Sequence, residues 1–212
     1  MAKPTPVGCV VTVAATLRWT DGLGVGAIPF SDLGSVPRMP VPEAQISEGR
    51  AGGPGWFVLN LSDSAAGTSP RSGTWTEFEP PPDGFPQYGV NVHVVMPGQA
   101  NCLYHEESNQ EDFLVLHGEC IAIIEEQERP LRQWDFVHCP AGTRHVFVGA
   151  GDGPCAILMI GARDPDDRTE YPVSEVAARH NASAAETTNT GREAYRDFPP
   201  ESHDERFVWP LG

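Results

Sequence analysis

Apolar residues are grouped along the chain in short runs separated by turns, a spacing typical of β-strands. Each run is followed by glycine, proline or charged residues, which favour turns over continued strands. Several short strands at this spacing predict a jelly-roll barrel or sandwich. The expected strands cover residues 56–61, 75–78, 90–96, 102–105, 111–116, 119–124, 135–139, 145–148 and 155–161.

The pattern also divides the chain into three parts. Residues 1–48 are rich in glycine, proline and alanine with weak periodicity, so we interpret them as an N-terminal extension. Residues 49–163 carry the predicted strands and form the expected barrel. Residues 164–212 are polar and acidic, and we expect a C-terminal tail there with one short helix from Glu175 to about His180, capped by Ser174.

Composition supports an all-β domain. The chain has 212 residues, of which 40% are hydrophobic, enough for one good core. Its 22 glycines and 21 prolines are natural for short strands joined by turns and unusual for a helical protein. We therefore predict a single small jelly-roll β-barrel with the two extensions.

Charge and hydropathy exclude several classes of partner. The net charge of −15 repels phosphate backbones and anionic membrane surfaces, so we expect neither nucleic acid nor membrane as a partner. No apolar run approaches the roughly 18 residues that a membrane span needs, and no secretion signal is evident, so we expect a cytoplasmic protein. Lys3 is the single lysine, which argues against Schiff-base chemistry. The five cysteines include no CxxC pair and are expected to be buried free thiols.

Four residues form the candidate site: His105, Glu107, Glu111 and His145. Side chains two residues apart on a strand leave the same face, so His105 and Glu107 should point together. Glu111 can join them if the chain turns between residues 106 and 110, and His145 must come from a distant strand. Two imidazoles with one or two carboxylates are a known ligand set for a mononuclear divalent metal.

These residues lie in two segments that resemble the two motifs of the cupins. The first cupin motif places a glycine, a His-x-His pair, a glutamate and a second glycine in order; the second motif contains Pro-x-Gly-xx-His. The resemblance covers residues 88–163 and implies a small β-barrel that holds a metal ion inside. The matching residues are Gly98, His105, Glu111 and Gly118 in the first motif, and Asp135, Pro140, Gly142 and His145 in the second.

The chain departs from the motifs at four positions. Glu107 stands in place of the usual second histidine, and Gly98 lies one residue too far upstream. In the second motif, Trp134 replaces the first glycine and Gly149 replaces the last asparagine. An oxygen-rich shell with both glutamates suits Fe(II), Mn(II) or Ni(II) better than Cu(I). If Glu107 turns away, the remaining three residues still make a two-histidine, one-carboxylate set. We expect Fe(II), with Mn, Ni and Zn as alternatives.

Residues around the ligands have proposed roles and simpler explanations. His93 could carry protons on a neighbouring strand, as Glu107 could, although a hydrogen-bonded histidine at a barrel rim is commoner. Phe113 and Phe147 share the faces of Glu111 and His145 and are expected to contact a bound organic molecule, although aromatic residues are by default core. Arg144 should point away from His145, which leaves no inward basic residue in the matched segments and disfavours a sugar phosphate.

The resemblance does not choose one reaction, because cupins include several enzyme classes and binding modules. We expect a mononuclear Fe(II)-type oxygenase that acts on a small organic molecule. Two alternatives remain open: a metal-dependent isomerase, decarboxylase or lyase, and a metal-containing module that binds a small ligand without changing it. Exposed sheet edges also favour a homodimer.

Overall fold

The computed structural model describes residues 40–53, 55–80 and 84–207. The chain divides into two units, Met1–Pro40 and Val41–Gly212, and the fold described below is that of the second unit. The expected N-terminal extension and Cys9 thus lie largely outside the described residues.

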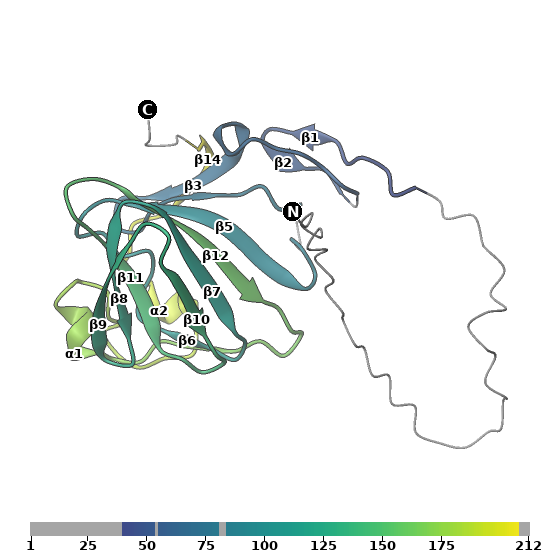
Figure 1. Ribbon diagram of the computed structural model, residues 1–212. Coiled ribbons are helices and arrows are strands. Elements are labelled where there is room, and N and C mark those ends of the chain that lie inside the picture. Colours follow the sequence, from purple (N-terminus) through teal and green to yellow (C-terminus); the bar gives the residue numbers. More distant parts are fainter. Residues whose placement is uncertain (1–39, 54, 81–83, 208–212) are drawn as a thin grey trace, which may run out of the picture. The chain divides into compact units, whose positions relative to one another are not determined.

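Two antiparallel sheets form the body of this unit (Figure 1). The larger sheet has seven strands in the order β10-β7-β12-β5-β4-β3-β14, and the smaller has three in the order β11-β8-β9. In the larger sheet the bounds are β3 Ala65–Ser69, β4 Gly73–Thr76, β5 Tyr88–Val95, β7 Glu111–His117, β10 Phe136–Cys139, β12 Cys155–Ala162 and β14 Ser202–Arg206; in the smaller they are β8 Glu119–Ile124, β9 Gln127–Arg132 and β11 His145–Ala150.

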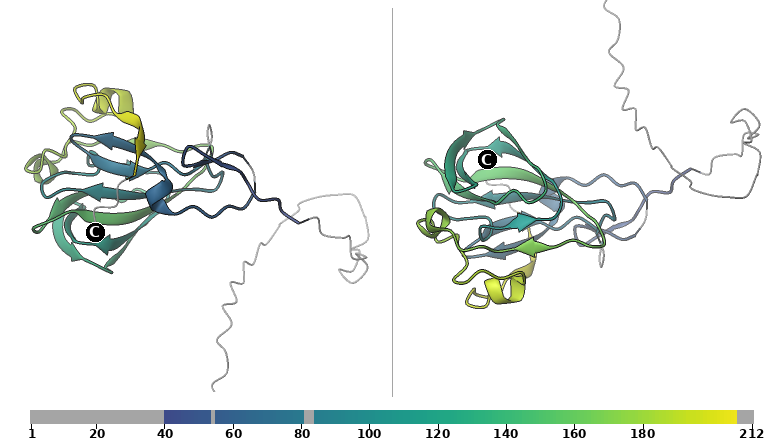
Figure 2. Two further views of the ribbon diagram at one scale, coloured as in Figure 1. Left: turned by 90° about the horizontal axis from the view of Figure 1, so that it is seen from above. Right: turned by 90° about the horizontal axis from the view of Figure 1, so that it is seen from below.

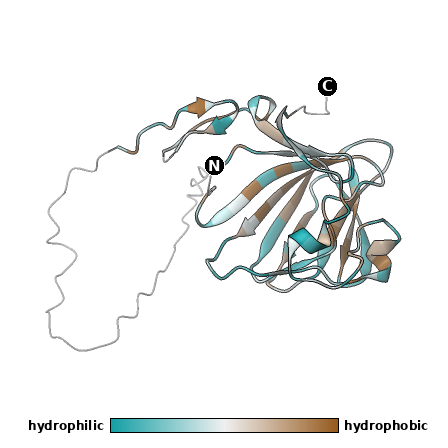
Figure 3. Cartoon of the chain, turned by 180° about the vertical axis from the view of Figure 1, so that it is seen from behind, coloured by the Kyte–Doolittle hydropathy of each residue, from teal (hydrophilic) through white to brown (hydrophobic). Residues whose placement is uncertain are grey.

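In the described residues, two small sheets and three short helical segments complete the fold. Strand β1 (Ile46–Ser47) pairs with β2 (Arg50–Ala51), and β6 (Glu106–Glu107) pairs with β13 (Thr169–Glu170). The 3-10 helix η2 covers Leu61–Asp63, α1 covers Glu175–Ala178 and α2 covers Gly191–Ala194. Both α-helices lie on the outer side of the sheets (Figure 2). The helix α2 is coloured as hydrophilic (Figure 3). The fold is the jelly-roll β-barrel expected from the sequence.

The main core lies between the sheets and follows the two-residue period of the strands. Phe113 and Val115 of β7 share one face, and they pack with Phe147 of β11 and Ile157 of β12. All four are nearly or fully buried. Burial of each large apolar side chain stabilises the fold by about 1.5–3 kcal/mol. This packing holds β7 and β11, the strands that begin at Glu111 and His145, in a fixed relation.

The C-terminal tail packs on its own barrel. Strand β14 pairs with β3, and Phe207 is buried against the larger sheet. Ala177 of α1 and the nearby Ala182 pack with Tyr104, Ile123 and Val146 in a second apolar cluster. The predicted helix is confirmed, with the Ser174 side chain accepting a hydrogen bond from the Ala177 N–H. The helix α2 was not expected.

Several sequence expectations differ from the structure. The run at residues 56–61 is not a strand: Trp56 makes only an isolated bridge with Glu43, and the segment ends in η2. Its side chains are partly or fully exposed, so no sheet neighbour covers them. The expected strand at 102–105 is also wrong, because that segment makes only the isolated bridge of His105 with His145. The structure adds strands that the pattern did not indicate: β1, β2, β3, β6, β9, β13 and β14.

The described cysteines are confirmed as free thiols; Cys120, Cys139 and Cys155 are buried, and Cys102 is partly buried. None of the helices in the described part of the chain has the length and apolar character that a membrane span requires.

Candidate metal centre

His105 and His145 are brought together by a backbone bridge. The His105 N–H donates to the His145 carbonyl (3.1 Å), and the His145 N–H donates to the His105 carbonyl (2.8 Å). Residues paired in this way place their side chains on the same side of the sheet. The two imidazole centroids are 4.8 Å apart. The distant strand predicted for the second histidine is therefore β11.

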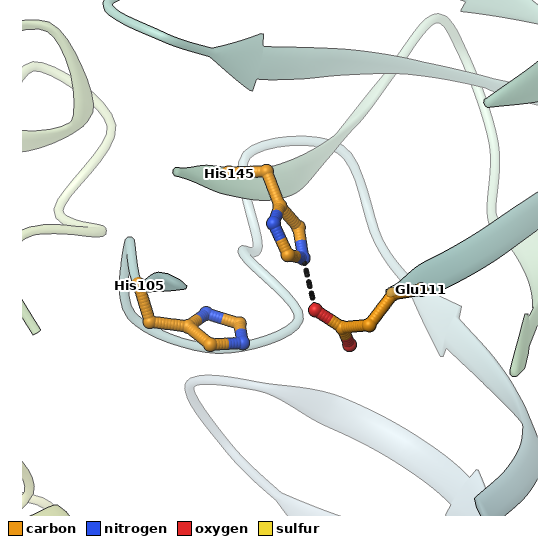
Figure 4. A group of neighbouring side chains, drawn as sticks. All are labelled: His105, Glu111 and His145. Carbon is orange, nitrogen blue, oxygen red and sulfur yellow. Dashed lines mark ion pairs between the residues drawn. The ribbon is translucent and has the colours of Figure 1, made fainter. Parts of the chain in front are cut away.

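Glu111 completes a group of three at the start of β7 (Figure 4). Its Oε2 lies 3.3 Å from His145 Nε2. One ligand atom from each of His105, Glu111 and His145 lies within 4.8 Å of the others. Ligand atoms bonded at about 2.0–2.2 Å to one ion lie roughly 3 to 4.4 Å apart. The limit of 4.8 Å exceeds this range slightly, so small rotations of the side chains would bring the three atoms onto a single metal ion.

The hydrogen bonds of the two histidines also suit metal binding. His105 Nδ1 lies 2.9 Å from the Leu103 carbonyl, and His145 Nδ1 lies 2.9 Å from the Thr143 carbonyl. A carbonyl oxygen can only accept, so each Nδ1 carries the proton and each Nε2 has a free lone pair. Burial lowers the pKa of both imidazoles, that of His105 to about 3, which keeps them neutral. Neutral imidazoles with free Nε2 lone pairs are metal ligands.

The carboxylate of Glu111 is costly to bury without a cation. Only 14% of its side chain is exposed. Burial and, to a smaller extent, the negative charge of Glu107 together raise the pKa of Glu111 to about 8. Neither histidine supplies a compensating positive charge, because both are neutral. A bound divalent cation would compensate the charge of Glu111, which is the second reason that the group fits a metal.

Glu107 lies beside the three residues but not among them. Its Oε1 is 3.8 Å from His105 Nε2, so the two side chains point together as predicted. A third of its side chain is exposed, and β13 flanks it through the pairing of Thr169 with Glu107. Burial and the nearby Asp167 raise the pKa of Glu107. Direct metal binding by Glu107 stays a prediction.

A cavity of about 410 Å³ contains the candidate ligands. Phe113 lines it, and its ring centroid lies 5.1 Å from that of His145. Phe147 does not line it; it is fully buried behind Phe113, with ring centroids 4.5 Å apart. The prediction that Phe147 contacts a bound molecule is therefore wrong; Phe147 instead supports Phe113, which lines the cavity. The other lining residues are Glu79, Gly89, Val90, Asn91, Asn101, Cys102, His105, Glu107, Glu111, His145, Met159, Gly161, Ala162, Arg163, Asp167 and Thr169.

His93 is placed elsewhere. It is buried on β5, where its Nε2 contacts the Ser72 carbonyl at 2.5 Å and its ring packs against Trp75. It does not line the cavity of the candidate ligands. The proton-transfer role predicted for His93 therefore has no support from its position, and we leave it out of the proposed function.

Arg144 points away from the cavity, as predicted. Its guanidinium binds Glu106 (2.8 Å) and Glu170 (3.3 Å). The expectation that the matched segments offer no inward basic residue is wrong, however, because Arg163, at their end, lines the cavity. It follows the last apolar strand in the sequence, where its position in the barrel could have been inferred only from the pairing of β12 with β5.

The C-terminal tail supports His105 from behind, which the sequence did not indicate. The Tyr195 hydroxyl accepts a hydrogen bond from the Leu103 N–H (3.0 Å), and the carbonyl of Leu103 accepts from His105 Nδ1. The ring of Tyr171 stacks on His105 with centroids 5.8 Å apart, and Tyr195 packs edge-on against Tyr171. Two tail tyrosines thus fix the orientation of one candidate ligand.

Comparisons with known proteins agree with this fold. Residues 91–161 match the family model described as "Cupin domain". No curated protein sequence matches the chain.

Three solved structures illustrate the likeness. A putative sugar phosphate isomerase from Acidithiobacillus ferrooxidans is 27% identical, with a TM-score of 0.39, over 41% of this chain and 56% of that one. A sugar phosphate isomerase of the cupin superfamily from Silicibacter pomeroyi is 26% identical, with a TM-score of 0.40, over 50% and 70%. The polyketide cyclase RemF from Streptomyces resistomycificus is 18% identical, with a TM-score of 0.46, over 56% and 87%. The chain thus spans little more than half the length of the first of these structures.

Proposed function

Because residues 91–161 form a cupin domain, we propose that this chain binds one divalent metal ion and acts as a metalloenzyme on a small organic molecule. His105, Glu111 and His145 would hold the ion. The observation that carries the proposal is the convergence of two free Nε2 lone pairs on a buried carboxylate. The cavity of about 410 Å³ around them supports a small substrate.

The ligand set favours one reaction class. Two histidines and one carboxylate with further positions open are the set found in non-haem Fe(II) oxygenases. When bound, Fe(II) would supply a redox-active centre for oxygenation of the substrate, and this is the reaction that we propose. Mn, Ni and Zn are the alternative ions.

The residues of the chain would orient the substrate and limit its contact with water. Phe113 and Met159 give the cavity an apolar side next to His145, where the hydrocarbon part of a substrate can pack. Tyr171 does not line the cavity, but its ring stacks on His105 and holds that candidate ligand in place. A substrate packed on Phe113 and Met159 would be kept close to the three candidate ligands.

The position of Glu107 favours a second candidate reaction. Its carboxylate lies 3.8 Å from His105 Nε2 and lines the same cavity, and burial raises its pKa above that of a free carboxyl, which favours a group that both takes and gives protons. An isomerase or lyase reaction needs such a proton carrier and no oxygen. Glu107 would then be its catalytic residue.

Reconstitution with Fe(II) under anaerobic conditions, followed by oxygen-uptake measurements with candidate substrates, tests the proposal. Substrate-dependent oxygen consumption that is lost in Glu111→Gln would support the oxygenase. Turnover without oxygen that survives replacement of iron by Mn or Ni and is lost in Glu107→Gln would support the isomerase or lyase. Recovery of every bound metabolite unchanged would contradict both and indicate a binding module.

A further inference from the structure

In the described part of the chain, Arg163 is the one arginine or lysine that lines the cavity of the candidate metal ligands. It follows the end of β12, and 39% of its side chain is exposed. An arginine at the rim of an otherwise acidic cavity is either half of a structural ion pair or a binding group for a ligand. Its hydrogen bonds distinguish these roles.

The ion pair of Arg163 uses only one of its nitrogens. Nη1 donates to Glu79 Oε2 (2.8 Å) and to the Phe85 carbonyl (2.7 Å). Glu79 also accepts from the backbone N–H groups of Phe85 (2.9 Å) and Val90 (2.6 Å), so its carboxylate is held without Arg163. A guanidinium has five N–H donors. The three on Nε and Nη2 have no partner among the residues that the structure describes.

Two glycines clear the space between Arg163 and the candidate metal centre. Gly161 of β12 pairs with Glu111 on one side and with Gly89 of β5 on the other, so the three residues form a row across neighbouring strands. A Cβ at Gly161 would lie 3.7 Å from Glu111 Oε1, and one at Gly89 would lie 2.9 Å from Arg163 Nη2. Neighbouring strands are about 4.8 Å apart, so the row spans roughly 10 Å. A ligand of a few bonds in length could reach from one end to the other.

A buried acceptor lies beside this row. Asn91, two residues after Gly89 on β5, lines the same cavity. Its Oδ1 is buried and has no hydrogen-bond partner among the described residues. A buried polar atom without a partner costs about 1–3 kcal/mol. A donor group on a bound ligand would remove this cost.

The charges of the cavity select the kind of anion. Glu79, Glu107, Glu111 and Asp167 all line it, and Arg163 alone opposes them among its lysine and arginine side chains in the described residues. A phosphate dianion is usually held by more than one basic group. A carboxylate carries a single charge and matches the planar Nε and Nη2 donors of one guanidinium in a bidentate manner.

We propose that Arg163 binds the carboxylate of a small organic ligand whose other end lies at His105, Glu111 and His145, and that Asn91 accepts a hydrogen bond from the ligand between them. The second half of this statement rests on the proposed function. The first half does not, because Arg163 and the row of glycines are present whether or not a metal binds.

Probes with two ends test the inference. Hydroxamic acids carry a metal-chelating head, and a chain of about two to four methylenes can place a terminal carboxylate near Arg163. The matched probe ends in a primary amide. Calorimetric titration of the Ni(II)-loaded full chain should show the carboxylate probe binding at least about tenfold more tightly than the amide. Arg163→Met should abolish this preference, and Arg163→Lys should keep part of it. Arg129→Met, which changes an exposed arginine on β9, should leave it intact.

The outcomes separate this inference from the proposed function. Metal content of each protein is measured first. If the metal binds and the wild-type chain does not distinguish carboxylate from amide, the inference is wrong and the proposed function stands. If no metal binds, the proposed function is wrong, and glutarate titrated into the metal-free chain still tests Arg163: weaker binding by Arg163→Met supports it, and equal binding overturns it. Tighter binding of inorganic phosphate than of glutarate would contradict the choice of a carboxylate.

Discussion

His145 Nε2 lies 3.3 Å from Glu111 Oε2, although the two residues begin strands of different sheets, β11 and β7. His145 Nδ1 faces the Thr143 carbonyl, so the nitrogen that faces Glu111 has no proton to donate. Without a cation, an ionised Glu111 would set a second electron-rich atom against this nitrogen in a nearly buried place, so the carboxyl keeps its proton up to a pKa of about 8. A cation between the two atoms would stabilise the ionised carboxylate, and the predictions below follow from that relation.

Replacement of Glu111 by glutamine should weaken metal binding at least about a hundredfold, because even supporting residues of metal sites contribute 10–100-fold. The variant keeps the size of the side chain and removes its charge. Glu106→Gln is the matched control, since Glu106 binds Arg144 outside the cavity. Titration of the metal-free proteins with Ni(II) gives the dissociation constants. Equal affinities in the two variants would show that Glu111 is not a ligand.

The stability of the metal-free protein should fall as the pH rises from about 6.5 to 8. Burial raises the pKa of Glu111 to about 8, so in this range the folded state keeps a proton that the unfolded state has lost. The histidines have the opposite effect, because burial lowers their pKa, but above about pH 6.5 their imidazoles are mostly neutral in both states. We expect a loss of roughly 1 to 2 kcal/mol in the free energy of unfolding.

Chemical denaturation with a chelator present, at several pH values, measures this loss. Glu111→Gln lacks the titrating group and should show a smaller decrease than the wild-type chain. The same slope in both proteins would mean that Glu111 ionises normally. Added metal should also reduce the decrease in the wild-type chain, because the ion stabilises the charged carboxylate.

Tyr195→Phe should weaken the positioning of His105, although Tyr195 is not itself a candidate metal ligand. The variant removes the hydroxyl that accepts the Leu103 N–H, and an unpaired buried donor costs about 1–3 kcal/mol. Metal affinity should fall about tenfold, as expected for a supporting residue. Tyr88→Phe is the control, because Tyr88 is exposed. If Tyr195→Phe lowers stability but leaves metal affinity unchanged, the tail stabilises the barrel and does not position the ligand.

Ser174→Ala should destabilise the tail alone. Its side chain caps α1 through the Ala177 N–H (3.0 Å) and donates to Glu126 Oε2 (2.9 Å). Loss of a helix cap costs about 0.5–2 kcal/mol. Thermal denaturation should show this loss, while metal content stays at the wild-type level. A variant with reduced metal content would reveal that α1 affects the centre.

Strands in which apolar and polar residues alternate, or which are wholly apolar, could be predicted from the sequence. Polar strands could not. Residues 119–124 coincide with β8 because their apolar side chains pack inside the barrel. Strand β9 (Gln127–Arg132) is almost entirely exposed and contains a proline, so its side chains carry no core signal; only its backbone pairing with β8 makes it a strand. The strand predicted at 56–61 is wrong for the opposite reason, since these residues are mostly apolar but lie outside the sheets.

The clustering of the candidate ligands could be predicted, but much of what surrounds them could not. Motif spacing placed the two histidines and Glu111 together, and strand parity placed Glu107 beside His105. Arg163 and Tyr195 reach the site through the pairing of β12 with β5 and through the path of the tail, and these long-range contacts leave no local pattern. Trp134 has a left-handed backbone (φ 76°), the conformation that favours glycine, in a place where the cupin motif has glycine.

The proposed function depends most on a single metal ion held by His105, Glu111 and His145. Diffraction data collected above and below the absorption edge of Fe or Ni, from crystals of the metal-loaded chain, test it most directly. We predict one anomalous peak within about 2.3 Å of His105 Nε2, His145 Nε2 and a Glu111 carboxylate oxygen. Loaded crystals with no peak among these three side chains, or with the metal bound elsewhere, would contradict the account.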